Sequence, residues 1–205
     1  MRSKTRGWRF AVNSRRHPED SSDLMELVRR RRTFTVVAVP LVMLAIAKPT
    51  PIGFAVGLCL VVLGQVVRIW AAGYIHKETE VTTGGPYAYV RNPLYVGSFL
   101  ISAGFAVMCG HWLAWLLVAV QYGFVYHLTV LSEERHLEEV LGEPYRRYRE
   151  AVPRWLPSVR PYAGRSGKFD VRQVAANKEF SSMVVVLLAC VLFLGKMLWL
   201  RQWLT

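Results

Sequence analysis

The sequence predicts an all-α fold, an integral-membrane helical bundle of about five transmembrane helices. Of its 205 residues, 53% are hydrophobic. Five apolar runs approach the ~20 residues that a helix needs to cross a bilayer, and the basic residues are spread unequally over the segments between them. The runs cover residues 33–47, 51–75, 94–108, 112–131 and 181–200, and the first and third are the shortest.

The segment before the first run, residues 1–32, is charged and ends in four consecutive arginines at 29–32. We expect a basic cytoplasmic segment, with a short surface helix over 23–30 that starts from a Ser22 cap. The first run follows these polar residues rather than opening the chain, and no small-residue cleavage site comes after it. A removable signal peptide is therefore not expected.

The second run carries two features that predict close contacts. Gly53, Gly57 and Gly64 have the spacing of small residues that let membrane helices approach closely. Arg68 is a charge inside the run, about two turns from its cytoplasmic end, and such a charge is costly without a partner. The sequence leaves two roles open for Arg68: an ion pair with Glu133 or Glu134, or a direct contact with a ligand.

The third and fourth runs are predicted to be antiparallel neighbours. Pro93 fits the first turn of a helix and disfavours helix in the residue before it, so Arg91 and Asn92 are expected in non-helical backbone at the membrane edge. Only residues 109–111 separate the two runs. Because the turn between them is so tight, the Asn92 end of one helix and the Glu133 end of the next should meet on the same side of the membrane.

After the fourth run the pattern changes to an amphipathic helix over 132–150, interrupted near 142–144. Residues 159–172 contain Pro, Gly and Ser and are expected to form a linker. The last run carries no motif and is expected to complete the bundle. The predicted organisation is a basic segment (1–32), a membrane core (33–157), a cytoplasmic linker (158–180) and a C-terminal transmembrane helix (181–205).

The basic residues also predict the orientation of the bundle. Ten precede the first run, two lie between the second and third runs, and ten lie between the fourth and fifth. Only Lys48, Lys196 and Arg201 fall on the other side. Positive charge marks the cytoplasmic face, so we expect a multi-pass protein with its amino terminus and its polar loops in the cytoplasm, and its carboxyl terminus outside.

The net charge of +12 is explained by this orientation and by attraction to anionic lipid at the cytoplasmic leaflet. No recognition motif accompanies the charge, so a nucleic-acid partner is not expected. Cys59 and Cys190 lie in apolar runs, Cys109 directly follows one, and the three have neither paired nor metal-ligand spacing. They are interpreted as packing residues, and no metal site is expected.

Four separate motifs lie in and after the middle of the chain. Residues 85–95 read Gly-Pro-Tyr-Ala-Tyr-Val-Arg-Asn-Pro-Leu-Tyr and are followed by Gly97, by Glu133-Glu134, by Gly-Glu-Pro-Tyr at 142–145 and by Val-Pro-Arg-Trp-Leu-Pro at 152–157. Their order and spacing resemble the superfamily of isoprenylcysteine carboxyl methyltransferases and phospholipid methyltransferases, over about residues 64 to 157. The resemblance implies an integral-membrane enzyme that transfers a methyl group from S-adenosylmethionine to a lipophilic acceptor, isoprenylcysteine-like or phospholipid-like, at a cytoplasmic cofactor pocket.

The resemblance also implies which residues hold the methyl donor. Backbone groups of a non-helical loop are free to bond adenine, tyrosine can stack on it, and a carboxylate can bond ribose hydroxyls or an ammonium. Adjacent helical residues point about 100° apart, so only one of the two glutamates should face the pocket, and the family pattern favours Glu133. The expected donor-binding residues are Glu80, Val81, Thr82, Tyr87, Asn92, Pro93, Leu94, Tyr95, Glu133 and Glu134.

Arg91 is the expected catalytic residue, because its forked guanidinium suits a carboxylate of the donor or orients the acceptor. A topology anchor is the competing interpretation. The chain departs from the family pattern at two positions: Asn92 stands where histidine is usual, and Thr129 stands where the prenylcysteine enzymes carry a substrate-binding arginine. The first removes a titratable group and the second weakens a prenylcysteine carboxylate as acceptor, with His127 as a speculative base.

Two other functions remain open from the sequence. A membrane reductase of the sterol type has a similar Arg-x-Pro-x-Tyr element and uses NADPH, whose phosphates could meet Arg146, Arg147 and Arg149. The glutamate pair argues against this function, since carboxylates suit an ammonium better than a phosphate. The third possibility is a non-catalytic membrane scaffold with the same fold. The sequence leaves the acceptor and the oligomeric state unassigned.

Overall fold

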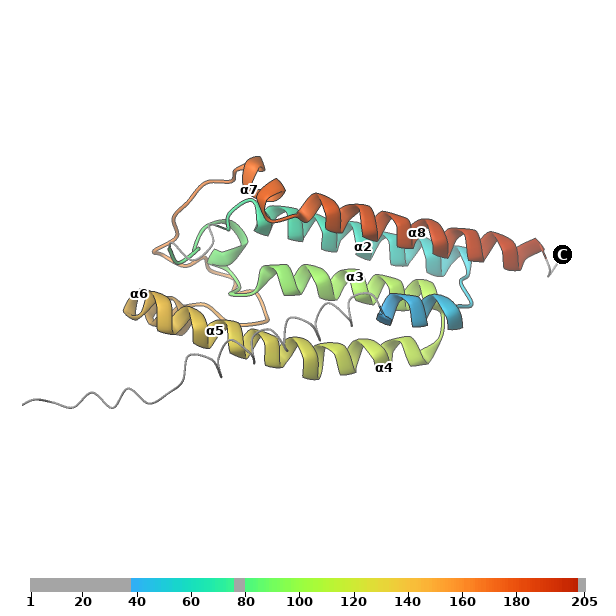
Figure 1. Ribbon diagram of the computed structural model, residues 1–205, viewed down its shortest axis with the longest axis horizontal. Coiled ribbons are helices and arrows are strands. Elements are labelled where there is room, and N and C mark those ends of the chain that lie inside the picture. The colour runs from blue at the N-terminus through green and yellow to red at the C-terminus, as the bar shows by residue number, and fades with distance from the viewer. Residues whose placement is uncertain (1–37, 76–79, 203–205) are drawn as a thin grey trace, which may run out of the picture.

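The computed structural model describes residues 38–75 and 80–202. Every regular element within those ranges is a helix, which confirms the all-α prediction (Figure 1). Residues 38–46 are helical. They are followed by α2 (Pro51–Ala72), η1 (Gly85–Ala88), α3 (Pro93–Cys109), α4 (Trp112–Val120), the π-helical turn η2 (Gln121–Tyr126), α5 (His127–Leu141), α6 (Glu143–Ala151), α7 (Val171–Ala176) and α8 (Glu179–Gln202).

Three of the described helices are long and apolar enough to cross a membrane: α2, the continuous helix Trp112–Leu141 that joins α4, η2 and α5, and α8. The third predicted span is α3, which is apolar but has 17 residues. The first predicted span is described only from residue 38 onwards. The helix expected over 23–30 and its Ser22 cap lie outside the described residues.

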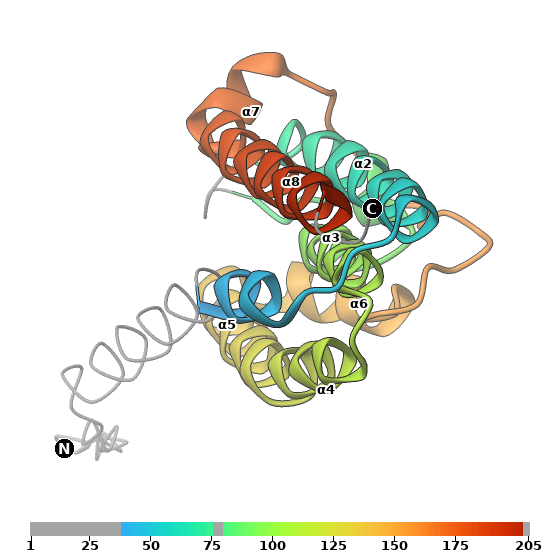
Figure 2. The same cartoon turned by 90° about the vertical axis from the view of Figure 1, so that its right-hand side faces the viewer.

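The long helices run side by side along the longest axis of the molecule (Figure 1). Viewed along that axis, α3 occupies the middle of the bundle, with α2 and α8 on one side and α4 and α5 on the other (Figure 2). The contacts agree with this view, since α2 touches α3 and α8 and α3 touches α4. A buried apolar core fills the interior. It consists of side chains from α2, α3, α4 and α8, together with Met43 and Ala47.

The helix ends follow from the sequence signals at each boundary. Thr50 caps α2, accepting a hydrogen bond from the Gly53 N–H at 3.1 Å, and Pro93 opens α3 as predicted. Gly110 ends α3 in the left-handed conformation, with a φ of 64°. His111 then caps α4 by accepting from the Leu113 N–H at 3.2 Å. The predicted tight turn between α3 and α4 is thereby confirmed.

Helices α2 and α3 meet through glycines. A Cβ atom added to Gly64 would lie 2.5 Å from the Gly97 carbonyl oxygen, and one added to Gly57 would lie 2.5 Å from that of Gly104. Real Cβ atoms do not approach so closely, so backbone packs directly on backbone along this contact. The prediction that Gly57 and Gly64 form a packing face is confirmed.

Residues 158–170 do more than connect α6 to α7. The Tyr162 N–H donates to the Ala88 carbonyl at 2.8 Å, and the Ser158 N–H donates to the Tyr89 carbonyl at 2.9 Å. The Ser166 N–H donates to Thr83 Oγ1 at 3.0 Å. This return segment therefore lies along the loop that contains η1, at one end of the bundle. The division of the chain at residue 157 stays a prediction from the sequence.

Candidate functional site

The start of α3, α5 and α6 come together at one end of the bundle, where η1 also lies (Figure 1), and most of the expected site residues belong to these elements or to the loop before α3. The backbone joins these elements directly. The Arg91 N–H donates to the Pro153 carbonyl at 2.9 Å, and the Tyr148 hydroxyl donates to the Tyr87 carbonyl at 2.8 Å. The predicted meeting of the Asn92 end of α3 with Glu133 and Glu134, which lie in the middle of α5, is confirmed by side-chain contacts between them.

Glu134 is buried and surrounded by donors. Its Oε1 accepts from the Asn92 side-chain amide at 3.1 Å and lies 3.5 Å from Arg91 Nε. Its Oε2 accepts from Arg154 Nε at 3.0 Å and lies 2.8 Å from Arg154 Nη2. A buried carboxylate needs such compensation. Glu134 therefore ties α5 to the residues before α3 and to the segment after α6.

Glu133 has a different environment. It is half-buried, and its Oε1 accepts from the Tyr95 hydroxyl at 2.9 Å. The Tyr95 ring is buried against Tyr126, with ring centroids 5.3 Å apart, and against Trp155 at 6.5 Å. The two adjacent glutamates thus face different partners, as their angular separation on a helix requires. Of the two, Glu133 is the more exposed and Glu134 is buried, while the contact of Glu133 with the donor stays a prediction.

Arg91 is a buried cation with spare donors. Its side chain is 9% exposed, and its Nε and Nη1 atoms are buried without a hydrogen-bond partner in the described part of the chain. Burial lowers the pKa of Arg91, and the charge of Glu134 acts against that shift. An arginine nevertheless stays protonated in proteins. Buried polar groups are usually paired, so these unpartnered N–H groups suit an anionic ligand.

Three tyrosines, one from η1 and two from α6, lie in the protein interior. Tyr87, Tyr145 and Tyr148 are all buried. Burial is the main cause that raises the pKa of each of these hydroxyls above its usual value. They are therefore neutral hydrogen-bonding groups at any physiological pH. The burial of Tyr87 places it in the protein interior rather than in an exposed aromatic belt, while its stacking on a donor stays a prediction.

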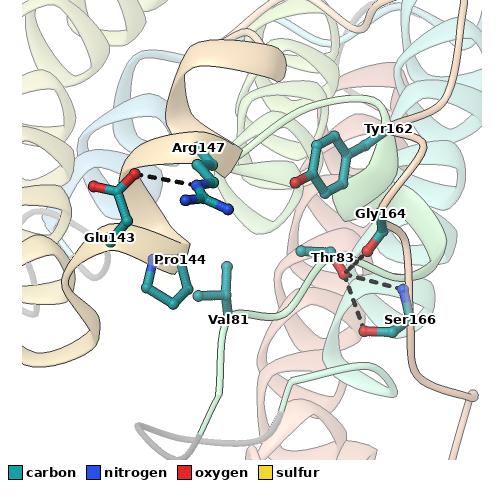
Figure 3. Close-up of a pocket in the computed structure, with 8 residues that line it drawn as sticks. All are labelled: Val81, Thr83, Glu143, Pro144, Arg147, Tyr162, Gly164 and Ser166. Carbon is teal, nitrogen blue, oxygen red and sulfur yellow. Dashed lines mark hydrogen bonds and ion pairs between the residues drawn. The ribbon is translucent and has the colours of Figure 1, made fainter.

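A cleft of about 420 Å³ opens between the start of α6 and the segments that contain Val81 and Thr83 and residues 162–166 (Figure 3). On one wall Glu143 and Arg147 of α6 form an ion pair at 3.1 Å. On the opposite wall the Thr83 hydroxyl lies 3.2 Å from both the Gly164 carbonyl and the Ser166 hydroxyl. The other lining residues are Val81, Pro144 and Tyr162. Of the expected donor-binding residues, Val81 lines this cleft.

Most of the expected donor-binding residues thus fall into two groups, and Tyr87, Pro93 and Leu94 belong to neither. Asn92, Tyr95, Glu133 and Glu134 meet in the charged cluster with Arg91. Val81 faces the cleft, with exposed Glu80 and half-buried Thr82 beside it. Pro93 is buried in the first turn of α3, and the Leu94 carbonyl accepts from the Ser98 hydroxyl at 2.9 Å.

Arg68 does not pair with Glu133 or Glu134, so that predicted ion pair is wrong. Its partner is Glu179 at the start of α8, with Nε 2.7 Å from Oε1 and Nη2 2.8 Å from Oε2. Glu179 follows Arg68 by 111 positions and lies in a helix without a motif. The buried carboxylate of this helix supplies the charge that Arg68 requires.

The two residues linked to acceptor binding also have defined surroundings. The Thr129 hydroxyl is buried and donates to the Val125 carbonyl of its own helix at 2.6 Å, so it does not replace a substrate-binding arginine. The His127 ring stacks on Trp155 with centroids 6.3 Å apart. Arg154 and Trp155 are the site residues that the sequence reasoning did not single out. Their signal was the motif at 152–157, which contains both.

Comparisons with known proteins agree with these motifs. A family model described as phospholipid methyltransferase matches residues 52–144. The chain is 31% identical over 100 residues to protein-S-isoprenylcysteine O-methyltransferase of Schizosaccharomyces pombe, covering 49% of this chain and 42% of that protein. It is 30% identical over 139 residues to the nickel-cobalt-cadmium resistance protein NccN of Alcaligenes xylosoxydans xylosoxydans, covering 64% of each.

A third relative is methanethiol S-methyltransferase of Crocosphaera subtropica, 37% identical over 73 residues, which cover 36% of this chain and 28% of that protein. The chain spans about half the length of the curated relatives it matches. No solved structure matches the chain.

Proposed function

Residues 52–144 place the chain in the phospholipid methyltransferase family, and on that premise we propose that the protein is an S-adenosylmethionine-dependent methyltransferase that acts on a lipophilic acceptor in the membrane. One observation carries the proposal. A buried arginine with two side-chain nitrogens that lack a hydrogen-bond partner among the described residues lies in the same cluster as a half-buried glutamate, at the end of a bundle of apolar helices. A site at this position can bind a polar methyl donor and an apolar acceptor side by side.

The residues present fit the donor. S-adenosylmethionine carries a carboxylate, an ammonium and a ribose diol, and it supplies an activated methyl group when bound. The unpartnered N–H groups of Arg91 suit the carboxylate. The Glu133 carboxylate suits the ammonium or the ribose, and the cleft beside Val81 offers a polar approach to the same loop. Transfer to the acceptor then depends on how these residues position the two reactants.

The surroundings of the cluster bear on the acceptor. The buried ring of Tyr95 and the half-buried ring of Trp155 stand beside Glu133 and offer an apolar boundary for a lipophilic molecule. Thr129 supplies no charge for a prenylcysteine carboxylate. Both a phospholipid-like and an isoprenylcysteine-like acceptor remain within the proposal, and the missing arginine favours the first.

The contacts of α6 weigh against a reductase. Arg146 pairs with Glu138 at 2.9 Å, and Arg149 bonds the same carboxylate. Arg147 pairs with Glu143. These three arginines, the ones available for the phosphates of NADPH, already have carboxylate partners, which leaves less positive charge for a dinucleotide.

Calorimetric titration of the purified protein with S-adenosylhomocysteine and with NADPH tests the proposal. We expect saturable binding of S-adenosylhomocysteine and none of NADPH. Binding of NADPH alone would favour the reductase, and binding of neither compound would favour the scaffold.

We also propose that the amino terminus and the charged cluster face the cytoplasm, because 22 basic residues lie on that side and 3 on the other. Membrane-impermeant thiol labelling of intact cells should then reach a cysteine tag placed after Thr205 and should not reach a tag placed before Met1. The opposite labelling pattern would reverse the orientation and would place the cluster outside.

A further inference from the structure

A second polar cluster lies between α2, α3 and α8, apart from the residues around Arg91. Glu179 is 3% exposed. Its Oε1 accepts from the Gln65 side-chain amide at 3.0 Å and from Arg68 Nε at 2.7 Å, and its Oε2 accepts from Arg68 Nη2 at 2.8 Å. Helix α8 lies beside α2 and outside the segment that matches the family model (Figure 2).

The second cluster reaches the first turn of α3. Arg68 Nη1 donates to the Ser98 hydroxyl, which in turn donates to the Leu94 carbonyl at 2.9 Å. The Arg68 side chain lies flat on α3, since a Cβ atom added to Gly97 would lie 2.6 Å from Arg68 Cγ. The residue next to Leu94 is Tyr95, whose hydroxyl donates to Glu133. A continuous set of contacts therefore runs from Glu179 to the Tyr95–Glu133 pair.

The cluster of Gln65, Arg68 and Glu179 is not needed merely to hold α8 in the bundle. Buried ion pairs contribute little net stability compared with apolar packing, and ionisable groups among apolar helices usually serve a function. Electrostatics also connect the two clusters. The pKa of buried Tyr87 is raised first by burial and then by Tyr148 and Glu133, while Arg68 lowers it and Glu179 raises it. Both clusters therefore act on the same side chain.

We propose that Glu179 is a positioning residue for donor binding: it fixes Arg68, which through Ser98 sets the first turn of α3 and hence the placement of Tyr95 against Glu133. The inference rests on the proposed function. It assigns a role in the site to α8, and it explains why a helix without a motif begins with a buried glutamate.

The test measures the affinity for S-adenosylhomocysteine by calorimetry in detergent. Glu179→Gln keeps the volume and removes the charge, and we expect roughly ten- to a hundredfold weaker binding, the size expected from a small displacement of site residues. Ser98→Ala cuts the chain of contacts without touching α8, and it should also weaken binding. Glu179→Asp keeps the charge and should recover part of the lost affinity.

Lys196 provides the matched control, because it holds α8 at a place outside both clusters. Its Nζ donates to the Leu44 and Ala45 carbonyls at 2.6 and 2.9 Å. Lys196→Met should lower the melting temperature without changing the affinity. Equal binding by folded Glu179→Gln and wild type, unchanged binding by Ser98→Ala, or an equal loss in Lys196→Met would overturn the positioning role alone. A wild-type protein that does not bind S-adenosylhomocysteine would overturn the proposed function, and the positioning role with it.

Discussion

Arg91→Ala should lose most methyl transfer, by about a hundredfold or more, the loss typical when one preorganised donor is removed from an active site. The guanidinium is buried, and its Nε and Nη1 atoms have no hydrogen-bond partner among the residues that the structure describes, although Nε lies 3.5 Å from the Glu134 carboxylate. We therefore expect these N–H groups to be used by the donor or the acceptor. The measurement is transfer of labelled methyl from S-adenosylmethionine into a total lipid extract. Arg91→Lys should recover little, because an ammonium lacks the planar fork of a guanidinium.

Arg154 is the control for this prediction. It also pairs with Glu134, at 2.8 Å compared with 3.5 Å for Arg91, and it is more exposed. If Arg91 served only to neutralise Glu134, then Arg154→Ala would be at least as damaging to turnover. We expect Arg154→Ala to lower the melting temperature and to retain much more activity. Full activity of Arg91→Ala would make that residue a topology anchor.

Glu133→Gln should weaken binding of S-adenosylhomocysteine by about ten- to a hundredfold while the bundle stays folded. The substitution removes charge and little volume at a half-buried position, where Tyr95 can still donate to the remaining amide oxygen. A hydrogen bond to a charged group contributes ~1.5–3 kcal/mol, which corresponds to this loss of affinity. Calorimetric titration of the variant and the wild type in the same detergent measures it.

Glu134→Gln is the matched comparison, since it makes the same chemical change at the next residue. Glu134 is buried among Asn92, Arg91 and Arg154. Breaking a buried ion pair from one side costs about 3–5 kcal/mol, so this variant should lose stability first. A Glu134→Gln protein that stays as stable as wild type and loses donor affinity, beside a Glu133→Gln protein that binds normally, would exchange the roles of the two residues.

The sequence predicted the features that depend on local patterns. Pro93 fixed the start of α3, Gly110 fixed its end, and the resulting short turn brought Asn92 next to Glu134, 42 positions away. The helical angle between adjacent residues also anticipated that Glu133 and Glu134 would face different partners. Which glutamate is buried depended on the packing of α6 and the segment after it. The sequence pattern did not specify that packing.

Local sequence patterns could not predict the ion-pair partners of the arginines. Arg68 required a counter-charge, and the sequence offered the nearest glutamates of the motif. The structure instead provides Glu179, because α8 lies beside α2 rather than beside α5. Similarly, Arg154 reaches Glu134 because the Arg91 N–H is bonded to the Pro153 carbonyl, a long-range contact that carries no sequence signature.

Under the proposed function, the glycine contact between α2 and α3 limits the route of an apolar acceptor. Carbonyl oxygens that lie against glycine Cα atoms leave no gap wide enough for an acyl chain, so these two helices form a closed wall. Elsewhere on α3, side chains rather than backbone contact η2, as between Phe99 and Tyr122, whose ring centroids lie 5.1 Å apart. Rings can swing aside without disturbing backbone packing, and Phe99 is already 41% exposed. Under the proposed function, we therefore expect the apolar part of the acceptor to reach the site on the Phe99 side of α3.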